Sequence, residues 1–219
     1  MKKVELINLR QKDRFLDDAY SALRTNILFS GYNMKIIAVT SCEPNEGKST
    51  NAFELSKSLA EVGKKVLFVD ADMRRSDFAK KYTQQVDIMG LSHFLSGQAQ
   101  TADVLYSTNI ENLYVLFAGV VPPNPAELLS GTMFTDFLAE AKQNFEYVII
   151  DTPPLGHVTD AAVCIAGSDG AVMVVSSGKT KLKRAREVKR IIDDIGTTFI
   201  GCILNNVKPT AKYKSSKYY

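Results

Sequence analysis

Ten residues in the first quarter of the chain join an apolar run to a helical pattern. Residues 41–50 read SCEPNEGKST, follow the run KIIAVT at residues 35–40, and lead into an amphipathic pattern from Ser49 onward. A turn between a strand and a helix directs successive backbone N–H groups at one point, and the helix N-terminus adds partial positive charge there. This context predicts a phosphate-binding loop.

Lys48 and Ser49 occupy the positions that give such a loop its chemistry. In the pattern G-x-x-x-x-G-K-[ST], the lysine neutralises the β- and γ-phosphates and the hydroxyl holds magnesium. Here Cys42 replaces the first glycine, and Asn45, which tolerates positive φ, keeps the turn accessible. The alternative is a Gly-Lys-Ser that merely ends a strand, but the flanking patterns favour phosphate binding. We expect nucleotide contacts from Glu46, Gly47, Lys48, Ser49 and Thr50.

Composition indicates one domain in the cytoplasm. The chain has 219 residues, 45% hydrophobic and 23% charged, which is enough to bury one substantial core. No apolar run approaches the roughly 18 residues of a membrane span, and the N-terminus lacks a signal-type apolar region. Three widely spaced cysteines fit neither a disulfide framework nor a zinc site, so we expect Cys42, Cys164 and Cys202 to be small buried side chains.

The net charge of +3 is unevenly spread. Residues 179–186 are basic, and the chain from Lys208 onward contains lysines and no acid. An acidic partner or a membrane surface is one interpretation of the first cluster. A solvated helix face with Leu182, Val188 and Ile191 turned inward is the favoured one. Aromatic residues are not interleaved with these charges, so nucleic acid is not an expected partner.

Strand-like and helix-like segments alternate, which predicts an α/β fold with a mostly parallel sheet flanked by helices. The strands are rich in Val, Ile and Leu without strict alternation, as is typical of strands buried on both faces. Expected strands lie near residues 35–40, 65–70, 112–118, 147–151, 171–176 and 199–205, and expected helices near 49–62, 126–144, 159–166 and 181–195.

Two end segments stand apart from this central domain of residues 31–207. Residues 1–30 carry a helical pattern that we expect to pack on the domain or on a neighbouring subunit. Residues 208–219 lack periodicity and are expected to form a flexible tyrosine-rich tail. The expected apolar stripe of the first segment is Phe15, Ala19, Leu23, Ile27 and Leu28.

Acidic residues follow two of the expected strands. Asp70 and Asp72 end the second strand on one side of the chain, and Asp151 ends the fourth, so all three are expected at the carboxyl edge where open α/β sheets bind ligands. For Asp70 or Asp151 taken alone, a helix N-cap is an equally good interpretation. Together with the loop, the three acids favour catalysis, and Arg74 or Arg75 is a candidate to stabilise charge on a transferred group.

Three carboxylates beside a triphosphate require a cation, and Mg²⁺ prefers oxygen ligands. Ser49 and Asp151 are the plain candidates to hold it, and Asp72 is a third. Asp70 and Asp72 are the candidates for the remaining catalytic roles, and one of them is expected to accept the proton of an attacking hydroxyl. The sequence does not assign which of the two does so.

Three segments resemble motifs of the bacterial tyrosine kinases, P-loop proteins unrelated to eukaryotic protein kinases. Residues 43–50 resemble the Walker A motif, VDADMR at residues 69–74 the Walker A′ motif, and IIDTPP at residues 149–154 the Walker B motif. Residues 90–97 and 119–129 are similar to family segments between the strands. The resemblance runs from about Asp18 to the end, and Asp-x-Asp-x-Arg is its most specific part.

The resemblance implies a single P-loop NTPase-type domain that uses ATP and Mg²⁺ to phosphorylate tyrosines on neighbours' tails within a ring. The phosphoacceptors would be Tyr213, Tyr218 and Tyr219, and Asn205 is the nearest match to a family Asn that contacts adenine. It also implies capsule or exopolysaccharide biosynthesis, a cognate tyrosine phosphatase and a membrane co-polymerase that activates the kinase. The separate-chain Gram-positive form would lie at the inner face of the plasma membrane through that partner.

The expected interface motif, Glu-x-x-Arg-x-x-Arg, is altered in this chain. Residues 18–24 read DAYSALR, so the acid is shortened to Asp18 and Ser21 replaces the first arginine. Asp18 and Arg24 still offer a charge pair across subunits. Ring formation and ring size are therefore left open.

Two other classes of protein compete with the kinase interpretation. Dimeric switch ATPases that position division sites or partition plasmids share this fold, but they carry an extra lysine where this chain has Glu43, and their usual amphipathic membrane helix is missing from the tail. A non-enzymatic nucleotide-binding adaptor would be expected to lose Lys48 or one of the carboxylates. All of these residues are present.

Overall fold

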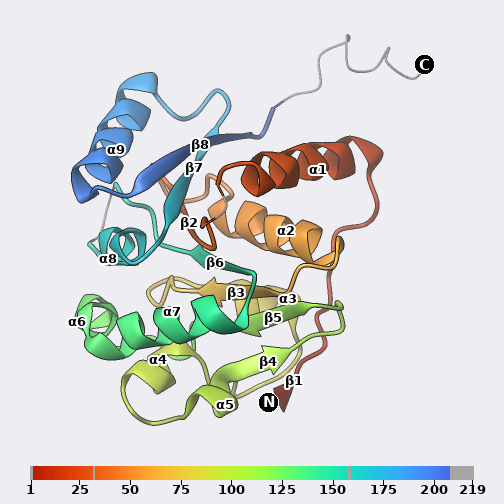
Figure 1. Ribbon diagram of the computed structural model, residues 1–219, viewed down its shortest axis with the longest axis vertical. Helices are drawn as coiled ribbons and strands as arrows, with labels where there is room; N and C mark the ends of the chain where they lie inside the picture. The colour runs from red at the N-terminus through yellow and green to blue at the C-terminus, as the bar shows by residue number, and fades with distance from the viewer. Residues whose placement is uncertain (1, 32, 157–158, 208–219) are drawn as a thin grey trace.

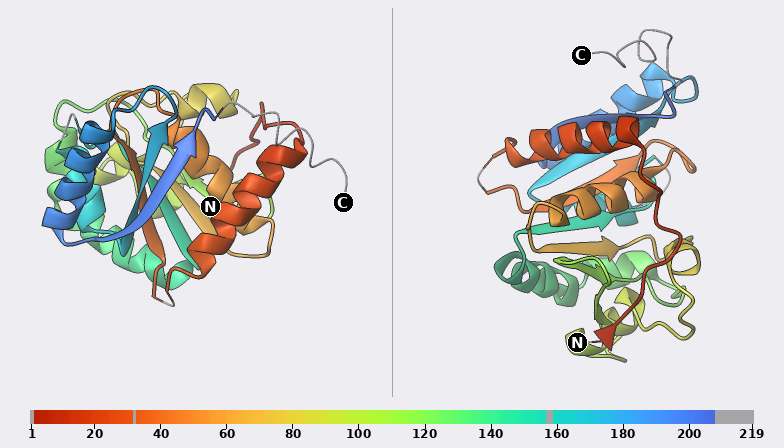
Figure 2. Two further views of the ribbon diagram at one scale, coloured as in Figure 1. Left: turned by 90° about the horizontal axis from the view of Figure 1, so that it is seen from above. Right: turned by 90° about the vertical axis from the view of Figure 1, so that its right-hand side faces the viewer.

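A sheet between two layers of helices organises the part of the chain that the computed structural model describes, residues 2–31, 33–156 and 159–207 (Figures 1 and 2). Its strands are β1 (Lys2–Lys3), β2 (Ile36–Ser41), β3 (Val66–Asp70), β4 (Leu105–Ser107), β5 (Leu113–Leu116), β6 (Tyr147–Asp151), β7 (Gly170–Ser176) and β8 (Thr198–Asn205). The helices are α1 (Arg14–Leu28), α2 (Lys48–Ala60), α3 (Phe78–Tyr82), α4 (Leu91–Leu95), α5 (Thr101–Val104), α6 (Pro125–Ser130), α7 (Thr132–Asn144), α8 (Asp160–Ala166) and α9 (Leu182–Ile195).

The eight strands of this described region form one sheet in the order β1-β4-β5-β3-β6-β2-β7-β8. All pairs are parallel except β4 with β5. Helices α1 to α3 cover one face, and α4 to α9 cover the other (Figure 2). The expected α/β class with a mostly parallel sheet is confirmed.

The central strands are apolar because both of their faces are covered. Ile37 and Ile149 pack among the side chains of α2 on one face, whereas Ala38 and Ile150 belong to core clusters on the other face. Burial on both faces removes the need for alternating polar residues. The six expected strands are all present, with ends that differ by a few residues at most.

Several short elements were not predicted. The single helix expected near residues 126–144 is wrong, because Gly131 adopts an extended backbone (φ −71°, ψ 155°) and separates α6 from α7. Glycine disfavours a helix interior, so this break has a local cause. The two-residue β1, the three-residue β4 and the short helices α3 to α5 carry too few residues for a periodic pattern.

Helix α1 packs on α2 with a different face from the one predicted. Ile27 is buried and Leu23 contacts the core, but Phe15 is 45% exposed, and Ala19 and Leu28 also face solvent. The prediction failed because polar groups occupy part of the buried face. The Tyr20 hydroxyl donates to Asn51 Oδ1 at 3.2 Å, and Arg24 donates to Ser58 Oγ at 2.8 Å.

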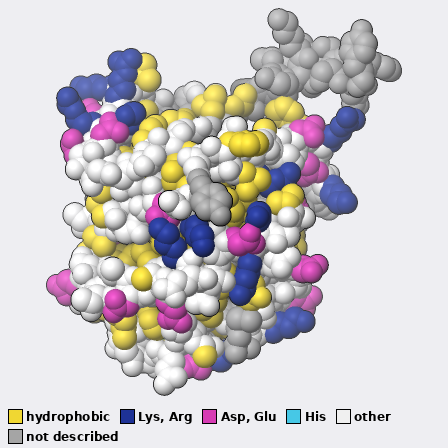
Figure 3. Space-filling model, in the orientation of Figure 1, with side chains coloured by type: hydrophobic (Ala, Val, Ile, Leu, Met, Phe, Trp, Pro, Cys, Tyr) yellow, Lys and Arg dark blue, Asp and Glu magenta, His cyan; other side chains and the backbone are white. Residues whose placement is uncertain are grey.

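Helix α9 also departs from its expected inward face. Val188 is fully buried as predicted, whereas Leu182 is 66% exposed and Ile191 is exposed. Leu182 opens the helix, so no preceding turn lies beneath its side chain. Ile191 lies one residue off the buried face, where Ile192 packs instead. Figure 3 shows Lys and Arg side chains gathered over α9 at the upper left, as a solvated basic face requires.

The cysteines were predicted only in part. Cys42 and Cys164 are buried, but Cys202 is exposed. Cys202 lies on β8, the edge strand of the sheet, where part of the strand faces solvent. Within the described ranges, no helix combines the length and apolar character required to cross a membrane.

We predict that Phe53→Ala strongly destabilises the fold. The Phe53 ring is fully buried on α2, with ring centroids 5.8 Å from Phe68, 5.1 Å from Phe78 and 4.6 Å from Tyr82. Truncation leaves a cavity and is expected to lower the free energy of unfolding by about 3–5 kcal/mol. Urea denaturation measures it.

The matched control is Phe29→Ala, because this ring is 84% exposed. Its effect on the free energy of unfolding is expected to stay within about 0.5 kcal/mol. Similar losses in the two variants would contradict the proposed importance of the aromatic cluster.

Candidate active site

The phosphate-binding loop joins β2 to α2 at the carboxyl edge of the sheet. Its turn uses two left-handed residues, Asn45 with φ 63° and Gly47 with φ 89°. The expectation that Asn45 accommodates positive φ is confirmed. Glycine is required at 47 for a second reason, since an added Cβ would lie 2.1 Å from Asn205 Nδ2. The loop therefore holds a tight conformation that ends directly on the helix N-terminus.

Glu46 fixes the shape of this loop from within. Its Oε2 accepts the backbone N–H groups of Cys42 at 2.8 Å and Glu43 at 3.0 Å, and its Oε1 accepts the hydroxyl of Thr180. The Glu46 side chain is buried, and its carboxylate is committed to these contacts, which hold the loop in shape. Sequence reasoning missed Thr180, which precedes α9 and carries no local signal for this contact.

Lys48 brings together the acids predicted at this edge. Its Nζ lies 3.0 Å from Asp72 Oδ2, 3.4 Å from Asp151 Oδ1 and 3.2 Å from Ser49 Oγ. Asp70 pairs in register with Asp151 across β3 and β6. The loop, the end of β3 and the end of β6 therefore bring Ser49, Asp72 and Asp151 around the Lys48 ammonium group, and Asp70 lies beside Asp151.

Burial and mutual repulsion govern the ionisation of these groups. Burial raises the pKa of Asp70 well above its usual range, and the charge of Asp151 adds to that effect. Burial likewise raises the pKa of Asp151, against the opposing influence of Lys48. Burial lowers the pKa of Lys48, but Asp151 and Asp72 outweigh it, so the net pKa is raised and the ammonium stays charged. The site therefore has a strong requirement for positive charge.

The donor set fits a magnesium ion shared with phosphate. Hydroxyl and carboxylate oxygens of Ser49, Asp72 and Asp151 converge on the place where the Lys48 ammonium lies. Within the described residues, no group of three or more His, Cys, Asp and Glu side chains is arranged to hold a metal by itself. This agrees with the usual behaviour of Mg²⁺, which takes one or two carboxylates and completes its shell with water and substrate phosphates.

Ser76 is a site residue that the sequence did not reveal. Its hydroxyl donates to Asp70 Oδ2 and accepts the backbone N–H of Phe78 at 3.1 Å. The backbone N–H of Asp72 reaches the other Asp70 oxygen at 3.3 Å. The carboxylate of Asp70 is thus held from both sides by the turn that follows β3.

The two candidate arginines lie differently from one another. Arg74 forms two hydrogen bonds to Asp160, with Nε 2.6 Å from Oδ2 and Nη2 3.0 Å from Oδ1. The side chain of Arg75 is exposed, and its backbone N–H donates to Asp72 Oδ1 at 3.1 Å. Sequence reasoning missed Asp160, whose place at the start of α8 resembles an ordinary helix-start acid.

The remaining predicted nucleotide contacts lie around the loop or outside the described residues. Asn205 Nδ2 donates to the Glu46 carbonyl at 2.9 Å, which places this amide against the loop. Thr50 is exposed on the first turn of α2. The predicted phosphoacceptors, Tyr213, Tyr218 and Tyr219, all lie outside the described residues.

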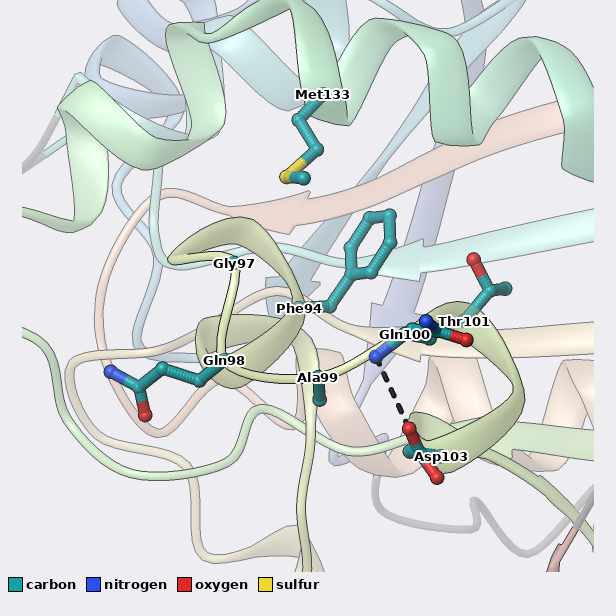
Figure 4. Close-up of a pocket in the computed structure, with 8 residues that line it drawn as sticks. All are labelled: Phe94, Gly97, Gln98, Ala99, Gln100, Thr101, Asp103 and Met133. Atoms are coloured by element: carbon teal, nitrogen blue, oxygen red, sulfur yellow. Dashed lines mark hydrogen bonds between the residues drawn. The ribbon is translucent and has the colours of Figure 1, made fainter.

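An open hollow of about 560 Å³ lies away from these motifs, between the α4–α5 segment and α7. The side chains of Phe94 and Met133 point toward one another across it, and Asp103 accepts the backbone N–H of Gln100 at its rim (Figure 4). None of its lining residues belongs to the three motifs. The hollow is therefore separate from the loop and the acids described above.

Comparison with known proteins decides the family. Residues 34–200 match a family model described as an AAA domain. The chain is 40% identical over 209 residues to the tyrosine-protein kinase CpsD of Streptococcus agalactiae, which covers 94% of this chain and 91% of that protein. The chain belongs to the bacterial tyrosine-protein kinase family. The resemblance inferred from the motifs is confirmed.

Solved structures agree with this family assignment. This kinase resembles the chimerical protein CapA2B2, with a TM-score of 0.86 and 30% sequence identity over 95% of each chain. It also resembles the septum site-determining protein MinD of Pyrococcus horikoshii, solved in complex with Mg-ADP, with a TM-score of 0.68 and 25% identity over 81% of this chain and 72% of that chain. The kinase therefore shares its fold with MinD.

We predict that Glu46→Ala loosens the kinase's phosphate-binding loop. The substitution removes the Glu46 acceptor from the buried N–H group of Cys42 and from the partly buried N–H group of Glu43. An unsatisfied buried donor costs about 1–3 kcal/mol, so the free energy of unfolding should fall by at least that amount. Urea denaturation measures this loss, and titration with a fluorescent ATP analogue should show weaker binding.

Glu61→Ala, at the C-cap of α2 and so at the far end of that helix from the loop, is the control for that substitution. The Glu61 side chain is 54% exposed and pairs only loosely with Lys57, at 3.8 Å. Its removal should change neither stability by more than about 0.5 kcal/mol nor nucleotide binding. Equal effects from both glutamates would refute the anchoring role of Glu46.

Proposed function

We propose that this chain is an ATP- and Mg²⁺-dependent protein-tyrosine kinase that phosphorylates tyrosines on the tails of other copies of itself. The observation that carries the proposal is the position of Lys48, which links the phosphate-binding loop to Asp72 and Asp151. This combination supplies donors for phosphate oxygens and acids for a metal at one edge of the sheet. Family membership supports the choice of tyrosine as the acceptor.

Backbone N–H groups of the loop and the Lys48 ammonium would bind the β- and γ-phosphates. Ser49, Asp72 and Asp151 are the residues that would hold Mg²⁺, which when bound neutralises charge on the transferred phosphoryl group. Lys48 already lies beside these oxygens, so a short side-chain movement suffices to exchange carboxylate contacts for phosphate contacts. Asn205, held against the loop, would contact adenine through its remaining amide groups.

Asp70 is our candidate for the base that accepts the tyrosine proton. A tyrosine hydroxyl has a pKa near about 10 and needs such a base to become a competent nucleophile. Burial and the neighbouring Asp151 raise the pKa of Asp70, which strengthens it as a base compared with an ordinary aspartate. Asp72 is engaged with Lys48 and is better placed to serve the metal.

The tail is proposed to act as substrate in trans. The last described strand, β8, ends at Asn205 beside the loop, so the segment that follows begins near the site. The twelve residues from 208 to 219 could span about 40 Å when extended. Each phosphorylated tyrosine gains about 1.5 to 2 negative charges and should then be repelled by the acids of the site.

We extend the biological role of the family to this chain as part of the proposal. That role comprises capsule or exopolysaccharide biosynthesis, activation by a membrane-embedded co-polymerase, and reversal by a cognate tyrosine phosphatase. The kinase would work in the cytoplasm at the inner face of the plasma membrane through its activator, as a homo-oligomer in which a ring is one arrangement. Phosphorylation would then respond to assembly, because each tail depends on a neighbour's site.

The switch-ATPase alternative has the shared fold in its favour but not the loop. In those proteins a lysine occupies the position of Glu43. Here the Glu43 carboxylate accepts a hydrogen bond from Arg184 Nε at 3.0 Å, so the Glu43 side chain is directed toward α9. The opposite charge at this position argues against their mechanism.

We predict that Lys48→Met abolishes ATP-dependent phosphorylation of the tail. Loss of this cation removes a phosphate ligand and leaves Asp72 and Asp151 without their buried partner. The rate of phosphate incorporation should fall at least about a hundredfold. Mass spectrometry of the tail, with the activator's cytoplasmic peptide present, provides the measurement. Lys57→Met, in the last turn of the same helix, should retain the incorporation of phosphate into the tail.

Continued ATP hydrolysis by the wild-type chain beside phosphate-free tails would reject the kinase proposal. That outcome would favour the switch ATPase. Loss of incorporation in both lysine variants would show that the helix, and not the Lys48 charge, is responsible.

We further predict transfer between copies. A variant with Tyr213, Tyr218 and Tyr219 all changed to Phe keeps its site but has no acceptor, whereas Lys48→Met keeps its acceptors but lacks a working site. Neither alone should gain phosphate, and the mixture should become phosphorylated on the Lys48→Met chain at a rate that rises with enzyme concentration. Intact-mass spectrometry distinguishes the two chains, and an unmodified mixture beside an active wild type would indicate transfer within one chain.

A further inference from the structure

A two-point ion pair ties Arg74 to Asp160. The guanidinium donates from Nε to Oδ2 at 2.6 Å and from Nη2 to Oδ1 at 3.0 Å, which is the fork geometry that makes arginine–carboxylate contacts directional. The two side chains differ in exposure, with Asp160 almost fully buried and Arg74 42% exposed. A buried acid thus holds an arginine that reaches toward solvent.

The pair leaves part of the guanidinium available for a ligand. Arginine carries five N–H donors, and these two contacts use two of them. In the part of the chain that the structure describes, no other side chain or carbonyl accepts from Arg74. Nη1 therefore keeps both of its donors, in a plane that the other two contacts have already fixed.

Among the described residues, Asp160 makes no side-chain hydrogen bond besides those to Arg74. It is the first residue of α8, where its charge also suits the helix N-terminus, and the N-cap Thr159 makes no side-chain capping hydrogen bond. Both oxygens of Asp160 are given to Arg74. An acid placed only to start the helix would direct an oxygen at a backbone N–H of the first turn.

The pair connects the two segments that supply the catalytic acids. Arg74 follows Asp70 and Asp72 on the turn after β3, and Asp160 lies beyond the segment that follows Asp151 and β6. These strands are neighbours in the sheet. The hydrogen bond to Asp160 raises the pKa of Arg74, and the negative charge of Asp72 contributes to the same effect. The guanidinium group is therefore close enough to Asp72 to interact with it electrostatically.

We propose that Asp160 is a positioning residue for phosphoryl transfer, which holds Arg74 so that its free N–H groups face the phosphoryl group in transit. The inference rests on the proposed function. In that step the tyrosine oxygen bonds to the γ-phosphorus, the bond from that phosphorus to the bridging oxygen breaks, ADP leaves with the electron pair, and the phenolic proton passes to a carboxylate. A cation already oriented stabilises the developing charge without reorganisation.

The test is Asp160→Asn, which keeps the size of the side chain but removes its charge and one acceptor. We expect kcat for tail phosphorylation to fall about 10- to 100-fold, as for other partners that orient a catalytic group. KM for ATP should stay within about threefold, because Lys48 and the loop bind the phosphates. Asp160→Glu restores the carboxylate with a longer stem and should recover part of kcat.

The matched control is Asp169→Asn, which also removes an acid paired with a cation. Asp169 contacts Lys142 and the backbone at the start of β2, at the opposite edge of the sheet. This variant should lose stability in thermal unfolding while its kcat stays near that of the wild type. A general loss of stability is thereby separated from a loss of positioning.

A double-mutant cycle with Arg74→Ala identifies the route of the effect. If Asp160 acts through Arg74, adding Asp160→Asn to Arg74→Ala should change kcat by less than about twofold. Every protein in the cycle is checked by thermal unfolding and by binding of a fluorescent ATP analogue. Should Asp160→Asn not fold, the cycle is run with Asp160→Glu.

Wild-type kcat in Asp160→Asn, or a double variant whose loss equals the product of the single losses, would overturn the positioning role while the kinase activity stands. Absence of transfer by the wild-type chain, with its activator peptide present, would instead overturn the proposed function and this inference with it. A rise in KM for ATP at unchanged kcat would assign Asp160 to nucleotide binding and reject the proposal.

Discussion

The enclosed ammonium group of Lys48 is the contact on which the other features of the site depend. Three acids approach one another at the sheet edge, and moving such charges out of water is costly unless a cation stays close. Lys48 supplies that cation from the first residue of α2, and the same side chain is the one that phosphates would attract. Under the proposed function, the stability of the site and its affinity for a nucleotide would both depend on this single side chain.

Rigid surroundings keep this arrangement in place. The strands that carry Asp70 and Asp151 are hydrogen-bonded neighbours in the core, so their spacing is set by the sheet. The loop is held by contacts from two distant segments, since Thr180 reaches the Glu46 carboxylate and Asn205 reaches the Glu46 carbonyl. These contacts shape the phosphate cradle before any ligand arrives, which lowers the entropy lost on binding.

The sequence predicts the elements that obey a local rule, and it misses those that depend on distant partners. The central strands and the convergence of Lys48 with the acids follow from apolar runs and from the edge at which parallel strands end. The contacts of Thr180 and Asp160 join residues that are 134 and 86 positions apart, and no periodicity marks them. The buried face of α1 was predicted wrongly for a related reason. Its inward positions include Tyr20 and Arg24, which hydrogen-bond to α2 and do not belong to an apolar stripe.

The amino-terminal arm has a consequence for solubility. Residues Lys2–Lys3 form the outermost strand β1 beside β4. The backbone N–H of Val4 donates to the Ser107 carbonyl, and the side chain of Leu6, in the same arm, is buried. A two-residue lysine strand is a poor template for further pairing. Clipping this arm would uncover the amide and carbonyl row of β4 together with an apolar strip, and so create a surface on which separate molecules adhere edge to edge.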